Sequence, residues 1–121
     1  MTSNEQLIRF LAEKVMGWYN GTKTLRHHWW CVVEGEEVCI ASPMWNPLDS
    51  WADAGVLWGK AAERGLYFVL ESRWREWVAF PRQGEDALFS KAKSGPRALS
   101  LAIAKAFGYD AALDAARERK P

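Results

Sequence analysis

The sequence predicts a single α+β domain in which three helices pack with a small antiparallel sheet of two hairpins, in the order α-ββ-α-ββ-α. Apolar residues recur at helical spacing in three segments, and pairs of short β-branched and aromatic runs lie between them. A few turn-forming residues separate the two runs of each pair, which favours antiparallel hairpins. The 121 residues suit one domain over 1–121, with a core over about 5–107 and a short helical extension over 108–121.

The first helix is predicted to begin at Ser3, because Ser3 followed by Gln6 has the spacing of a capping box. It is predicted to end at Gly17, ahead of the turn-forming pair Asn20-Gly21. Its apolar face comprises Leu7, Phe10, Leu11, Met16 and Trp18.

The first hairpin is predicted after a polar loop over 19–28. Its strands are the apolar runs 29–33 and 38–41, and the sequence Glu34-Gly35-Glu36 between them predicts the turn.

The second helix is predicted after the two prolines of the loop 42–47, with Asn46 or Asp49 as its N-cap. Gly65 stands where a helix-terminating glycine is expected. The small residues of this helix predict close packing against a neighbour. The face that would pack comprises Trp51, Ala54, Gly55, Trp58, Ala61 and Ala62.

The second hairpin is predicted from the strands 66–70 and 74–80, with its turn at Ser72-Arg73. The segment 81–95 is the least apolar part of the chain and is interpreted as a connection or as a lid over a site. The last main helix is predicted over 96–107, since Pro suits a first turn and a glycine follows.

The charge balance argues against a binder of duplex nucleic acid. Sixteen basic and 15 acidic residues give a net charge of +1, which is too small to neutralise many phosphates. The N-terminal residues MTSNEQLIRF include neither a basic region nor an uninterrupted apolar one, and no stretch approaches the ~20 apolar residues of a membrane span. We therefore expect a cytoplasmic protein with reduced cysteines and no membrane partner.

The candidate catalytic and metal-binding groups match no known pattern. His27 and His28 with Cys31 and Cys39 could bind a metal, but their spacing fits no zinc signature, and loop and core positions are the simpler interpretation. No nucleophile elbow and no glycine-rich phosphate loop occurs. The carboxylate pairs lie in predicted turns. The sequence therefore predicts no enzyme, no cofactor and no metal site.

Tryptophan and arginine form the clearest functional pattern. Eight tryptophans exceed what one small core accommodates, so some are expected at a binding surface. Indole rings stack on nucleobases, and guanidinium groups bind phosphates. The predicted ligand-binding residues are Trp29, Trp45, Arg73, Trp74, Arg75 and Trp77. The alternative is that any one of these tryptophans belongs to the core, as we expect for Trp18, Trp51 and Trp58 on the helical faces.

Two passages resemble a known family. The sequence EKVMGW at 13–18, and the sequence WNPLD at 45–49 that leads into 52–54, resemble motifs of the phage α/β/α-sandwich domain family, and the resemblance covers roughly 5–107. It implies that fold, a phage origin and the bacterial host cytoplasm as location, but the family brings no established activity. The sequence departs from the family pattern at 29–40, at 81–95 and after Gly108.

These observations lead to two functional hypotheses. Phage genes of this size often encode counter-defence factors, so the first is a phage-encoded, non-enzymatic binding protein, an oligomeric sponge that sequesters a nucleotide immune signal between subunits. The second is a protein inhibitor that docks on a host defence complex such as a CRISPR effector, because tryptophan and arginine also concentrate at protein–protein hot spots. The residues alone do not distinguish the two.

Overall fold

The computed structural model describes residues 2–20, 28–41, 44–82 and 89–109, and its helices and strands confirm the predicted α+β class. The helices are α1 (Ser3–Phe10), the π-helical turn η1 (Leu11–Val15), α2 (Trp51–Glu63) and α3 (Gly95–Ala106). The strands are β1 (Tyr19–Asn20), β2 (Trp29–Val33), β3 (Glu36–Ala41), β4 (Phe68–Arg73), β5 (Glu76–Pro81) and β6 (Ser90–Ala92).

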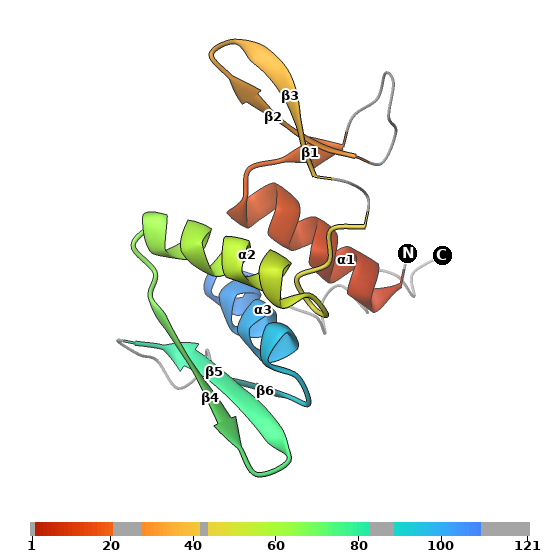
Figure 1. The fold of residues 1–121 in the computed structure, drawn as a ribbon. Coiled ribbons are helices and arrows are strands. Elements are labelled where there is room, and N and C mark those ends of the chain that lie inside the picture. Colours follow the sequence, from red (N-terminus) through yellow and green to blue (C-terminus); the bar gives the residue numbers. More distant parts are fainter. Residues whose placement is uncertain (1, 21–27, 42–43, 83–88, 110–121) are drawn as a thin grey trace.

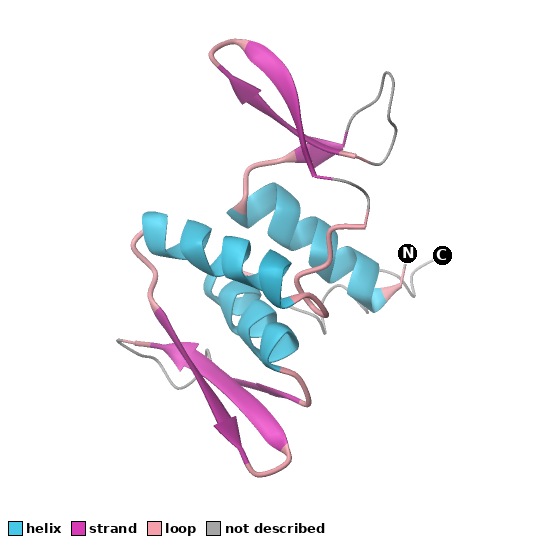
Figure 2. Cartoon of the chain, viewed as in Figure 1, coloured by secondary structure: helices cyan, strands magenta, loops and turns pink. Residues whose placement is uncertain are grey.

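The strands form two separate antiparallel sheets, β1-β2-β3 and β4-β5-β6, where the sequence predicted one sheet of two hairpins. Each hairpin gains a short third strand: β1 comes from the predicted polar loop and β6 from the predicted connection 81–95. The helices lie between the two sheets (Figures 1 and 2), so the hairpins cannot pair with each other.

Helix α3 lies at the centre of the molecule and packs on the inner face of the second sheet and on α2. Most residues of α3 are buried, because the helix consists largely of small and apolar residues. The Ser100 hydroxyl, fully buried, donates a hydrogen bond of 2.9 Å to the Pro47 carbonyl and so ties α3 to the loop before α2. The buried residues of α3 are Gly95, Pro96, Ala98, Leu99, Ser100, Ala102, Ile103 and Ala104.

Helix α1 begins at Ser3, but its N-cap is not the Ser3 of the predicted capping box. Thr2 is the N-cap, and its hydroxyl accepts a 3.2 Å hydrogen bond from the Glu5 amide. The helix then widens into η1, where the Met16 amide bonds to the Leu11 carbonyl at 3.1 Å. This wide turn changes which residues face inward. The buried residues are Leu7, Leu11, Ala12, Val15 and Trp18, while Phe10 and Met16 are half-buried.

Helix α2 is capped by Ser50, not by Asn46 or Asp49. The Ser50 hydroxyl accepts from the Asp53 amide at 3.2 Å, while Asn46 instead organises the preceding turn through the Leu48 amide at 3.0 Å. The predicted inward face is partly wrong. Its buried residues are Ala54, Leu57 and Ala61, Trp58 is half-buried, and Trp51 is 55% exposed.

Trp51 rests on Gly95, where α3 begins. A methyl group added at Gly95 would overlap atom Cη2 of the Trp51 indole. On its other side Trp51 meets Trp77 of β5 edge to face, with ring centroids 5.3 Å apart. Gly95 therefore permits a contact that joins α2, α3 and the second sheet.

Gly95→Ala is expected to destabilise the fold by about 1–2 kcal/mol. The added methyl group would displace the Trp51 indole, which would then lose its edge-to-face contact with Trp77. Chemical denaturation measures the change. In the background of Trp51→Ala the same glycine substitution should be close to neutral, and an equal loss in both backgrounds would contradict the account.

The two hairpin turns occupy two residues each. Glu34 and Gly35 both adopt positive φ, at 51° and 83°, as a tight hairpin turn requires. The second turn is Trp74-Arg75, which corrects the prediction of Ser72-Arg73. Both of those residues belong to β4 and pair with Trp77 and Glu76 of β5.

Three predictions fall on residues outside the described part of the chain. They concern His27, residues 83–88 of the polar insert 81–95 and the helical extension from residue 110 onward. Within the described part, Gly65 and Gly108 have φ of 85° and 95° and end α2 and α3 as predicted.

Candidate functional site

The six predicted ligand-binding residues divide into a buried group and an exposed group. Trp29 and Trp45 are core residues, only 5% and 6% exposed. Trp45 packs edge to face against Trp18, with ring centroids 5.0 Å apart. Both rings belong to the same buried cluster as residues of α1 and η1. Their burial disfavours base stacking on these two rings, which stays a prediction.

Trp77 lies on the inner face of the second sheet. It is half-buried and packs on the core beside Trp51, and its cross-strand partners are Ser72 and Ala92. Its neighbours in sequence, Glu76 and Val78, belong to the opposite face because side chains alternate along a strand. Trp77 therefore anchors the hairpin from within and does not share a surface with the arginines.

The Trp74-Arg75 turn is the most exposed aromatic site in the described chain. Trp74 is 84% exposed, and the Arg75 guanidinium carbon lies 5.3 Å from the centre of its ring, in cation–π geometry. Arg75 has a φ of 61°, a left-handed conformation that disfavours any side chain with a Cβ. The turn thus presents a stacked indole and guanidinium at the free end of the β4–β5 hairpin (Figure 1).

The outer face of the second sheet continues from this turn. Arg73 forms an ion pair with Glu71 at 3.1 Å, and its guanidinium carbon lies 5.7 Å from the centre of the Phe89 ring. The Lys91 ammonium also lies 5.7 Å from that ring, which stacks on Phe80. Val78 on the same face is fully buried, so these side chains cover it.

Phe89 and Lys91 were missed from the sequence, because the segment 81–95 was given no strand. The alternation of Phe89, Ser90 and Lys91 was the available signal: Ser90 is buried and Lys91 exposed. Three residues are too few for that pattern to stand out.

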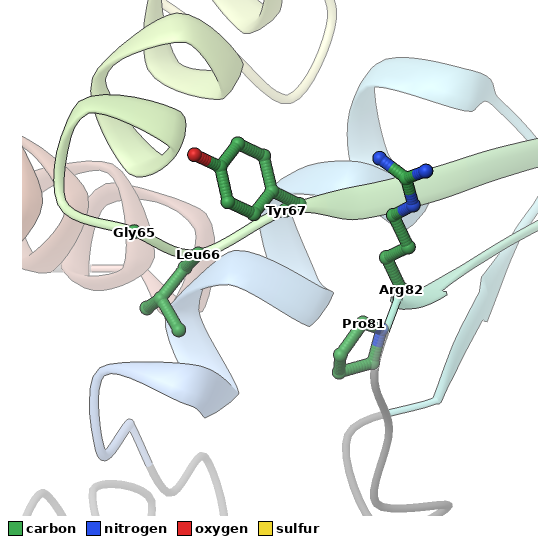
Figure 3. Close-up of a pocket in the computed structure, with 5 residues that line it drawn as sticks. All are labelled: Gly65, Leu66, Tyr67, Pro81 and Arg82. Atoms are coloured by element: carbon green, nitrogen blue, oxygen red, sulfur yellow. The ribbon is translucent and has the colours of Figure 1, made fainter.

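A shallow hollow of about 460 Å³ lies at the other end of the same sheet, lined by Gly65, Leu66, Tyr67, Pro81 and Arg82. Figure 3 shows the side chains of Tyr67 and Arg82 on one side of the strands and those of Leu66 and Pro81 on the other. The Arg82 amide donates to the Tyr67 carbonyl at 2.8 Å, which keeps the two side chains adjacent. Tyr67 is 57% exposed and was also missed by the sequence interpretation.

The first sheet carries the two cysteines and a buried tyrosine hydroxyl. Cys31 pairs with Val38 and Cys39 with Trp30, so the two thiols occupy opposite faces of the ribbon. Among the described residues, no group of three or more His, Cys, Asp or Glu side chains gathers as a metal site would need. Burial raises the pKa of Tyr19, and the negative charge of Glu37 raises it further.

Tyr19→Phe is expected to reduce the loss of stability in alkali. The raised pKa means that the folded state holds the phenolic proton more tightly, so its stabilising effect is complete below about pH 10 and is lost as pH rises toward the folded pKa. Denaturation from about pH 9 to about pH 11 should show a shallower decline for Tyr19→Phe than for the wild type. Parallel curves would contradict the assignment.

Comparison with family models, curated proteins and solved structures finds no match for this chain. No helix of the described chain is long and apolar enough to span a bilayer.

Proposed function

We propose that this chain is a non-enzymatic binding protein that inserts the Trp74-Arg75 turn into a concave site of a protein partner. Its setting, by the resemblance of its motifs, is phage counter-defence, with a host defence complex such as a CRISPR effector as the target. The observation that carries the proposal is the 84% exposure of Trp74 at the end of a hairpin.

Three physical arguments favour a protein partner at this turn. Small ligands are bound in concave sites that bury most of their surface, whereas the turn is the projecting end of a hairpin (Figure 1). Tryptophan and arginine are the residues that most often supply hot-spot energy at protein interfaces. An exposed indole already stacked with its guanidinium loses little conformational freedom on docking.

The strained backbone of Arg75 supports the same interpretation. A left-handed arginine is less stable there than a glycine would be, and such strain is common where a side chain serves a binding site.

Arg75→Gly is therefore expected to raise the free energy of unfolding by about 1 kcal/mol while it weakens partner binding about tenfold or more. Gly35→Ala is the matched control, since Gly35 has a φ of 83° in the first hairpin turn and an alanine there should lower stability by about 1 kcal/mol. Urea denaturation compares both variants with the wild type. A less stable Arg75→Gly would refute the strain argument.

Sequestration of a nucleotide is the second candidate function, supported by a different part of the sheet. Phe89 lies next to Arg73 and Lys91, each 5.7 Å from its ring centre, and Tyr67 lies beside Arg82 in the hollow, so both sites hold an aromatic ring next to a cation. Such pairs suit a base and a phosphate. Both surfaces are shallow in one chain, so a second copy would have to close the site.

Affinity capture from defence-carrying cells separates these candidates. Wild-type, Trp74→Ala and Tyr67→Ala proteins serve as baits, and bound proteins and nucleotides are quantified by mass spectrometry. The proposal expects a host protein that is retained by Tyr67→Ala and lost with Trp74→Ala. A nucleotide lost with Tyr67→Ala and unaffected by Trp74→Ala would favour the second candidate.

A further inference from the structure

We propose that copies of this chain associate head to tail, with the outer edge of β3 in one copy paired to the outer edge of β4 in the next. The two three-stranded sheets would then join into one sheet of six strands. The inference concerns edges away from the Trp74-Arg75 turn and goes beyond the proposed function.

The first observation is that both edges are open and equal in length. β3 and β4 each contain six residues, and each is the outermost strand of its sheet, with no described strand on its outer side. Unpaired edges attract further strands unless they are blocked. Residues 71–73 of β4, next to the turn, are exposed, and so are residues 36–40 of β3.

The second observation is the surface of the first hairpin. It carries four exposed aliphatic side chains, Val32, Val33, Val38 and Ile40. Its charges are Glu34, Glu36 and Glu37, with no lysine or arginine between residues 28 and 41. Charge repulsion disfavours pairing of this ribbon with its own copy, whereas a strand with a basic residue and an apolar half would suit it.

Strand β4 has a basic residue and an apolar half, and in one register these match the residues of β3. In antiparallel pairing Glu36 stands opposite Arg73, Cys39 opposite Leu70 and Ile40 opposite Val69. In the same register Val38 stands opposite Glu71. A slip of two residues places the like charges of Glu36 and Glu71 opposite each other, and the slip in the other direction moves Glu36 past the end of β4 to Arg75 in the turn, so both lose the Glu36–Arg73 pair. Residues 36–39 pair regularly with β2, because the register shift lies at the base of the hairpin beside Trp29 and Trp30.

The partner must be another copy, because within one chain the helices separate the two edges (Figure 1). The contact joins two different surfaces, so a pair of copies still has one β3 edge and one β4 edge open. Association is therefore expected to continue with concentration, as a ring or a filament, and not to stop at a two-fold dimer.

Charge reversal on either edge tests the register. Glu36→Arg and Arg73→Glu are each expected to weaken self-association about tenfold in sedimentation analysis of the full chain, with unchanged circular dichroism. Both substitutions in one chain should restore association. An equimolar mixture of the two single variants should also associate beyond two chains, because both contacts between unlike copies pair opposite charges at positions 36 and 73.

Other results would overturn the proposal. A wild-type monomer at all concentrations, or an Arg73→Glu variant that associates as the wild type does, would exclude the β3–β4 contact. Trp74→Ala is the control that separates this inference from the proposed function: it should lose the protein partner and retain self-association.

Discussion

Trp45→Ala is expected to lower the free energy of unfolding by about 3–5 kcal/mol, the range for removal of a large aromatic side chain from a core. Trp45 is 6% exposed, lies in the loop that precedes α2 and packs edge to face on Trp18. A small domain has a total stability of about 5–15 kcal/mol, so this one substitution removes a large fraction of it.

Urea denaturation followed by circular dichroism measures this effect. Trp74→Ala is the matched control, since it removes the same side chain from an exposed turn and should change stability by no more than about 0.5 kcal/mol. Similar losses for the two variants would contradict the assignment of Trp45 to the core and of Trp74 to the surface.

Trp74→Ala is expected to weaken partner binding by about 30-fold or more, which corresponds to the ~2 kcal/mol or more of a hot-spot residue. The substitution removes the indole that would contact the partner. It also removes the ring on which Arg75 stacks, with its guanidinium carbon 5.3 Å from the ring centre. Calorimetry with the captured partner gives the dissociation constants.

Trp74→Phe is the control for this prediction, because it retains an aromatic face and should lose only part of the affinity. Plating efficiency on defence-carrying cells should follow the same order, with wild type above Trp74→Phe and Trp74→Phe above Trp74→Ala. Equal affinities for all three proteins would show that the turn is not the docking element.

The helices and hairpins were predictable because their signals are local. Gly65 and Gly108 end helices through their own backbone freedom. Gly35 supplies positive φ in the first hairpin turn, although the third residue predicted for that turn, Glu36, belongs to β3. The separation into two sheets was not predictable in this way. Strand β1 has two residues and β6 has three, too few for a periodic pattern, and the position of the helices between the sheets depends on long-range packing.

The candidate site was half predictable. Arg73, Trp74 and Arg75 are adjacent in sequence and remain together in the structure, whereas Trp29 and Trp45 were grouped with them by residue type alone. Burial separates these residues, and burial depends on contacts such as Trp18–Trp45 that join elements distant in the chain. For the same reason Trp51, on a predicted inward face, is exposed where α2 crosses the start of α3.

Photo-crosslinking from position 74 determines whether the Trp74-Arg75 turn contacts a host protein. A photoreactive amino acid replaces Trp74 in one protein and Met44, which is 82% exposed away from the turn, in another. Each protein is irradiated in defence-carrying cells. The proposed docking predicts one discrete crosslinked host protein from position 74 and none from position 44. Absence of a crosslink at position 74, or the same products from both positions, would contradict it.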